Sequence, residues 1–88
     1  MTPYAKAQRA MAQLKAAVHE LIEAGPESGL SNAEIGRALG IYAGHQGHQG
    51  HVSRTILAMM EAEGVVVQDA DTKRWRLSVM AGKPRVND

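Results

Sequence analysis

The 88-residue chain contains no cysteine and no phenylalanine, and its only aromatic residues are two tyrosines and one tryptophan. The absence of cysteine excludes a disulfide framework and a thiolate metal site. So few rings argue against a stacking surface for single-stranded nucleic acid. No apolar run approaches the roughly 20 residues of a membrane-spanning helix, and Met1–Lys6 lacks the apolar core of a signal peptide. We therefore expect a cytoplasmic protein with no membrane partner.

Acidic residues are missing from the middle of the chain. Between Arg37 and Met60 there is no aspartate or glutamate, whereas four acidic residues precede this window and five follow it. The formal net charge is only +1. The sequence therefore predicts a local positive face rather than a basic domain as a whole.

No pattern in the chain indicates catalysis. A nucleophile beside a base, a phosphate-binding glycine loop and a pair of catalytic carboxylates are all missing. The length and the 44% content of apolar residues suit one small globular domain. We predict a protein that is not an enzyme and has no cofactor, with a single domain over residues 1–80 and a flexible tail over residues 81–88.

Apolar residues at three- and four-residue spacing predict a helix from about Pro3 to Ala24, which Gly25-Pro26 ends. Its expected inward face consists of Met11, Leu14, Val18, Leu21 and Ile22. This helix is longer than a three-helix core needs. The surplus, Tyr4–Ala10, is either an arm that forms a homodimer through the N-terminal helix or a frayed, solvated end.

A short second helix is predicted to begin at Ser31, because Ser31 and Glu34 have the spacing of a capping box. Its expected inward residues are Ile35, Ala38 and Leu39. Gly36 costs about 1 kcal/mol relative to alanine inside a helix, and close approach of a neighbouring helix would offset this cost. Gly40 is expected in the left-handed conformation that ends a helix.

A third helix is predicted from about His51 to Glu63, before Gly64. Its expected apolar stripe consists of Val52, Ile56, Met59 and Met60, with Leu57 at the margin. The residues expected on the opposite side are His51, Arg54, Thr55 and Ala58.

The C-terminal part of the chain predicts a β-hairpin. Val65–Gln68 is rich in β-branched residues, residues 69–73 are turn-like, and Arg74–Val79 alternates. On the second strand, Trp75, Leu77 and Val79 are expected to point one way, and Arg74, Arg76 and Ser78 the other. A two-stranded hairpin is marginal alone and must pack on the helices.

This ordered set of elements resembles the winged helix-turn-helix family, in its small bacterial, plasmid or phage regulator type. The segments that carry the resemblance are 31–35, 39–41, 52–54, 60–66 and 73–77. The resemblance implies a mainly α fold of the α+β class, with a three-helix core and a two- to three-stranded wing. It also implies binding to double-stranded DNA, as a transcriptional regulator or DNA-associated accessory factor.

In that family the helix after the turn enters the major groove, and the wing touches the backbone or the minor groove. Carried over by position, the groove-facing residues are His51, Arg54 and Thr55, and the wing contacts are Lys73, Arg74 and Arg76. Ser53 is also included among the predicted DNA-binding residues. Arginine can donate to O6 and N7 of guanine, whereas cations on a wing neutralise phosphates without reading sequence. These side chains can also be solvated surface residues, and Trp75 is expected to anchor the hairpin rather than stack on bases.

The chain departs from this family at residues 42–51, where ten residues stand in place of about four or five. The surplus repeats a Gly-His-Gln triplet. Three interpretations stay open. In the first, Gln46, His48, Gln49 and His51 contact phosphates or bases. In the second, His45, His48 and His51 bind a divalent metal ion. In the third, the triplets are an inert polar loop.

Two alternative functions come from other classes. The first is a protein–protein interaction module on a winged-helix fold, supported by the modest net charge and the long apolar first helix. The second is a His-rich regulator that senses metal or pH, supported by the triplets. Retention on duplex DNA that weakens steeply with salt would distinguish DNA binding from protein interaction.

Overall fold

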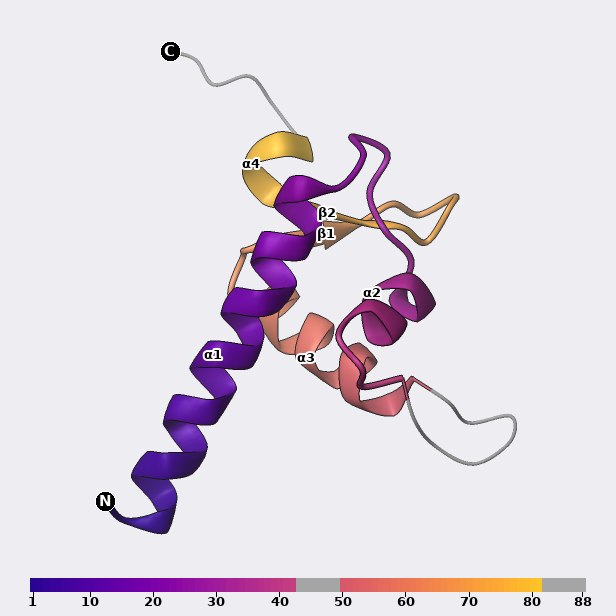
Figure 1. Ribbon diagram of the computed structural model, residues 1–88. Helices are drawn as coiled ribbons and strands as arrows, with labels where there is room; N and C mark the ends of the chain where they lie inside the picture. Colours follow the sequence, from indigo (N-terminus) through magenta and orange to yellow (C-terminus); the bar gives the residue numbers. More distant parts are fainter. Residues whose placement is uncertain (43–49, 82–88) are drawn as a thin grey trace.

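The structure, a computed structural model, describes residues 1–42 and 50–81 (Figure 1). These residues form three helices, a two-stranded antiparallel hairpin and a final short helical turn. The elements are α1 (Pro3–Ala24), α2 (Asn32–Ala38), α3 (His51–Ala62), β1 (Val66–Gln68), β2 (Trp75–Leu77) and α4 (Ser78–Ala81). The predicted α+β class, with three helices and a hairpin, is therefore confirmed. The predicted tail lies, from residue 82 onward, outside the described residues.

Helix α1 has the predicted bounds because both of its ends carry strong local signals. The Thr2 hydroxyl accepts a hydrogen bond from the amide of Ala5 at 3.0 Å, and Pro3 occupies the first turn, where its missing amide costs nothing. Val18 and Ile22 are buried. The segment at residues 3–10 is exposed along its whole length and projects past the rest of the molecule (Figure 1).

Helix α2 begins with the predicted capping box. The hydroxyl of Ser31 accepts from the amide of Glu34 at 3.0 Å, and the carboxylate of Glu34 accepts from the amide of Ser31 at 2.9 Å. Ile35 is buried as predicted, but the prediction for Ala38 is wrong, because Ala38 is exposed. The buried side lies between Ile35 and Gly36, and position 38 points about 110° away from it at 100° per residue.

Gly36 lies where α2 meets α3, which confirms the predicted close approach. A Cβ atom at this position would lie 2.9 Å from the hydroxyl oxygen of Ser53 and 2.9 Å from Cδ1 of Tyr42. The cost of glycine inside the helix is therefore offset by a contact that any side chain would obstruct. Gly40 has a φ of 72°, which confirms the predicted left-handed end of the helix.

Helix α3 is rotated relative to the prediction. Ile56 and Met60 are buried as expected, but Leu57 is fully buried rather than marginal, and Val52 is 43% exposed rather than part of the stripe. The reason is that α3 contacts α1, α2 and β1. Neighbours on several sides widen the buried arc and move its centre toward Ser53, Leu57 and Met60. Among the described residues, the buried core consists of Val18, Ile22, Ile35, Ile56, Leu57, Met60, Val66, Trp75 and Leu77.

The hairpin pairs β1 with β2 so that Val66 lies opposite Leu77. Trp75 and Leu77 are buried as predicted, but Val79 is 70% exposed. The predicted second strand is too long, because the chain leaves the hairpin at Ser78 and turns into α4. The amide of Ser78 donates to the carbonyl of Val65 at 2.9 Å, and this bond holds the exit.

A third extended segment joins the hairpin at one residue. The amide of Leu30 donates to the carbonyl of Trp75 at 3.0 Å, and the amide of Trp75 donates to the carbonyl of Leu30 at 2.7 Å. The adjacent Gly29 has a φ of 90°, and a Cβ there would lie 2.4 Å from the Trp75 carbonyl oxygen. The α1–α2 connection is thus paired directly with β2, and Gly29 makes that approach possible.

We predict that Gly36→Ala destabilises the protein although alanine is the better helix former. The added methyl must displace Tyr42 or Ser53, and overpacking of this kind typically costs about 1–3 kcal/mol. The measurement is the free energy of unfolding from urea titration. An increase in stability would show that α2 and α3 separate easily.

We predict that truncation of two aliphatic residues of α3 affects the free energy of unfolding to very different extents. Leu57→Ala should lower the free energy of unfolding by about 2–5 kcal/mol, because it empties a fully buried site. Val52→Ala should change it by less than about 0.5 kcal/mol, as is usual for an exposed side chain. Urea titration of both variants checks the rotation of α3, and equal losses would contradict it.

Candidate nucleic-acid interface

The outward face of α3 carries the residues that the sequence placed there. The exposed residues on this side are His51, Arg54, Thr55 and Ala58. They lie opposite the buried Ser53, Leu57 and Met60 of the same helix. This face is polar and basic, and α3 contains no acidic residue before Glu61.

Ser53 does not belong to this surface. Its side chain is fully buried, and its hydroxyl donates to the carbonyl of Gly50 at 3.3 Å. It also lies against Gly36 of α2. A ligand on the outer face of α3 cannot reach it, so the prediction of Ser53 as a contact is wrong.

The N-terminus of α3 is built around Gly50, which has a φ of 87° and no side chain to cap the helix. A Cβ at this position would lie 2.9 Å from Cε1 of Tyr42 and 3.4 Å from Nη2 of Arg54. The side-chain amide of Asn32, through Nδ2, donates to the Gly50 carbonyl at 3.3 Å. Glycine therefore lets the Asn32 side chain and the Tyr42 ring pack closely against the start of α3, with the Arg54 guanidinium beside them.

Arg37 completes this arrangement from α2. Its guanidinium carbon lies 4.6 Å from the centroid of the Tyr42 ring, a cation–π contact. Arg37 is exposed, and sequence reasoning did not select it, although it begins the acid-free window. We refer to Arg37, Tyr42, Gly50 and Arg54 as the α3 N-terminal cluster. Two guanidinium groups thus converge on the positive end of a helix.

The three cations of the hairpin have different environments. Lys73 is exposed and has a φ of 65° at the end of the turn. Arg74 is half-buried, and its guanidinium donates to the carbonyl of Gly29 at 3.0 and 2.8 Å and to the carboxylate of Glu34 at 3.0 Å. Arg76 is half-buried, with its stem near Gly29. Lys73 is therefore the most accessible of the three.

The turn between the strands is held by Asp69. Its carboxylate accepts from the amides of Asp71 and Thr72, both at 2.8 Å. These backbone hydrogen bonds hold the pKa of Asp69 below its usual range. The turn therefore presents Lys73 from a defined backbone, although an ionised Asp69 lies close by.

The positions on α3 and on the hairpin form two separate patches. The hairpin turn and the N-terminal end of α3 both lie on the side of the molecule away from α1, with α2 between them (Figure 1). Glu34 of α2 is an acid in this region, and Arg74 neutralises it. Arg74 thereby connects the hairpin to α2, and its guanidinium is occupied by the Gly29 carbonyl and the Glu34 carboxylate.

The carboxyl of Glu34 has a lowered pKa. The hydrogen bond from the Ser31 amide is the largest cause, and the nearby charge of Arg74 adds to it. The carboxylate is therefore more favourable in the folded protein than in the unfolded chain. Its contribution to stability is present above the usual pKa of 4.5 and is lost as the pH falls through the lower folded value.

Several predicted contacts fall in the triplet segment. Gln46, His48 and Gln49 lie outside the described residues, as does His45 of the alternative metal site. Within residues 1–42 and 50–81, no three histidine, aspartate or glutamate side chains lie close enough together to hold a metal ion. None of the helices in these ranges combines the length and apolarity that crossing a membrane requires.

Comparison with protein-family models, with curated proteins and with solved structures found no match to this chain.

We predict that Arg74→Ala raises the pKa of Glu34 toward its usual 4.5, because an attractive charge and a hydrogen bond are lost. The side-chain carboxyl resonance in an NMR pH titration reports this directly. Arg9→Ala is the control, since it removes an arginine from the exposed arm of α1. If both variants leave the titration of Glu34 unchanged, Arg74 does not anchor the hairpin to α2.

Proposed function

We propose that this protein binds double-stranded DNA as a winged-helix transcriptional regulator or DNA-associated accessory factor. The N-terminal half of α3 would lie in the major groove, and the hairpin turn would contact the phosphate backbone. The observation that carries this proposal is the α3 N-terminal cluster, in which Arg37 and Arg54 converge on one helix end inside an acid-free window.

Helix N-termini favour phosphate because their amides point outward and the helix dipole is positive there. Arg37 and Arg54 approach that end from different helices, so they can contact phosphates on either side of a docked helix. His51 and Thr55, one turn apart on the exposed face, suit contacts with base edges. These features support entry of this end of α3 into a groove.

The hairpin supports the same docking with fewer cations than the sequence implied. Lys73 is the best-placed backbone contact, because it is exposed at the turn. Arg74 acts mainly as an anchor, since its guanidinium donates to Gly29 and Glu34. Arg76 would reach a phosphate only through the outer part of its guanidinium.

The test is binding of a fluorescently labelled duplex of mixed sequence, followed by anisotropy at several salt concentrations. We predict that the Arg37→Gln/Arg54→Gln variant flattens the log–log salt slope by about 2 units, because each lost phosphate contact removes about 0.9. Lys73→Gln should flatten it by about 1 unit. All three residues are exposed, so the melting temperature should change little.

Arg9→Gln provides the matched control, because it removes one exposed arginine from the far end of α1. Its slope should equal that of the parent. The proposal is overturned if the wild type does not bind the duplex at low salt. If Arg9→Gln flattens the salt slope as much per lost charge as Arg37→Gln/Arg54→Gln does, net charge and not the α3 N-terminal cluster explains the binding.

A specific observation favours protein interaction as the second candidate function. Two apolar hollows flank α1, one lined by Ala17, Leu21 and Leu39 and the other by Met11, Leu14 and Val52. Binding that is indifferent to salt and insensitive to the Arg37/Arg54 variant would support this second function.

A further inference from the structure

Helix α1 has a second apolar face that its own domain leaves partly uncovered. The residues of this face repeat at alternating spacings of three and four, and they are Ala7, Ala10, Leu14, Ala17, Leu21 and Ala24. We call this face the α1 seam. Ala7, Ala10 and Ala24 are exposed and the other three are half-buried. The seam runs for about 26 Å at ~1.5 Å per residue, and its spacing is that of a helix that packs against another helix.

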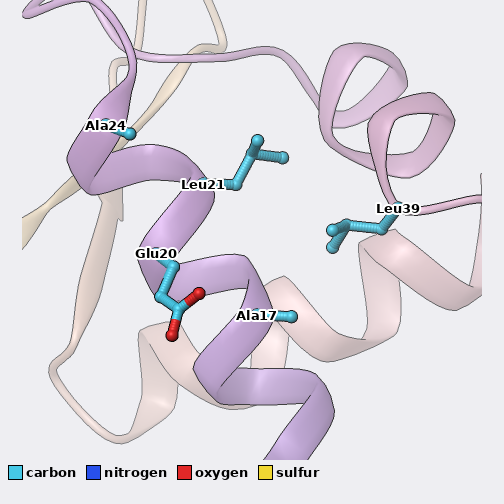
Figure 2. Close-up of a pocket in the computed structure, with 5 residues that line it drawn as sticks. All are labelled: Ala17, Glu20, Leu21, Ala24 and Leu39. Carbon is cyan, nitrogen blue, oxygen red and sulfur yellow. The ribbon is translucent and has the colours of Figure 1, made fainter.

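The seam borders an open hollow at its C-terminal half (Figure 2). The hollow has a volume of about 300 Å³ and lies between α1 and Leu39 at the end of α2. In Figure 2, Ala17 and Leu21 point from α1 toward Leu39 across the open space. The carboxylate of Glu20 lies beside this hollow. An apolar helix with a nearby cation would therefore match this surface.

The exposed arm of α1 has those properties. Residues 3–10 carry Lys6 and Arg9 and no acidic residue, whereas residues 16–24 carry Glu20 and Glu23 and no lysine or arginine. The charge of α1 is thus reversed along its length. Two copies of α1 that lie antiparallel would bring opposite charges together, and two parallel copies would bring like charges together.

The charges that flank the seam follow the same symmetry. Lys6, Gln13 and Glu20 occupy equivalent positions seven residues apart, each directly before a seam residue. In an antiparallel pair centred on Gln13, Lys6 of one copy lies beside Glu20 of the other, and the reverse holds on the other side of the two-fold axis. Within the part of the chain that the structure describes, neither Lys6 nor Glu20 has an ion-pair partner.

We propose that two copies of this chain form a two-fold symmetric dimer in which their α1 seams pack antiparallel. The exposed arm of each copy lies along the hollow of the other, and Lys6 and Glu20 form two equivalent ion pairs across the axis. Alanines at most seam positions allow the two helices to approach closely. This pairing covers the arm, which is otherwise exposed to solvent.

The middle of the seam lies next to the second hollow. Leu14 of the seam lines it together with Met11, Val52 and Ile56, and its volume is about 320 Å³. In the antiparallel arrangement the middle turns of the partner's α1 pass this point. The dimer therefore also covers Val52, which is exposed in the single chain.

Sedimentation equilibrium of the full chain over a range of concentrations, without DNA, tests the proposal. The wild type should dimerise. Glu20→Lys and Lys6→Glu should each weaken dimerisation about ten- to thirtyfold, because each turns two attractions into two repulsions. The double variant Lys6→Glu/Glu20→Lys should restore the dissociation constant to within about threefold of the wild type, since opposite charges face each other again.

Glu27→Lys is the matched control, because it makes the same charge change at an exposed position beyond the end of α1. It should dimerise like the wild type. A wild type that stays monomeric overturns the proposal, including the case in which a different protein occupies the seam. A double variant as weak as either single variant also overturns it. Circular dichroism melts of each variant distinguish lost pairing from lost folding. Because sedimentation is measured without DNA, a failure of DNA binding would leave the dimer proposal unaffected.

Discussion

The backbone pairing of Leu30 with Trp75 holds this small fold together. A two-stranded hairpin is marginal by itself, and here its second strand is tied by two hydrogen bonds to the connection between α1 and α2. The pairing requires Gly29, because a Cβ there would collide with the Trp75 carbonyl. Trp75 is then buried against the helices. The hairpin and the helices therefore form one core instead of two weak units.

Polar contacts reinforce the same junction. Arg74 donates to the carbonyl of Gly29 and to Glu34, and Glu34 also closes the capping box with Ser31. One carboxylate thus serves the start of α2 and the base of the hairpin. The position of the hairpin turn relative to α2 depends on this arrangement. The sequence predicted Arg74 as a ligand contact, but in the structure Arg74 orients the turn that carries Lys73.

The sequence predicted what local chemistry determines. Caps and a Gly-Pro pair set the ends of α1, and Ser31 with Glu34 sets the start of α2. Gly36 correctly indicated a close helix contact. The errors arose where distant residues decide. Leu57 and Val52 exchange roles because α3 has neighbours on several sides, and the partners of Arg74 lie 40 and 45 residues away. Arg37 was missed because its stacking on Tyr42 is visible only after folding.

Both proposals depend on which side of α3 faces α1 and which side faces solvent. The buried face of α3 is fixed by α2 and the hairpin, which leaves its N-terminal end with Arg54 outward and Val52 toward α1. Basic groups therefore gather at one edge of the open surface, and apolar groups gather at the other. The proposed DNA contact uses the first edge, and the proposed dimer uses the other. His51 and Thr55 line the hollow beside Val52 and also lie on the outward face, so the two edges meet at these residues.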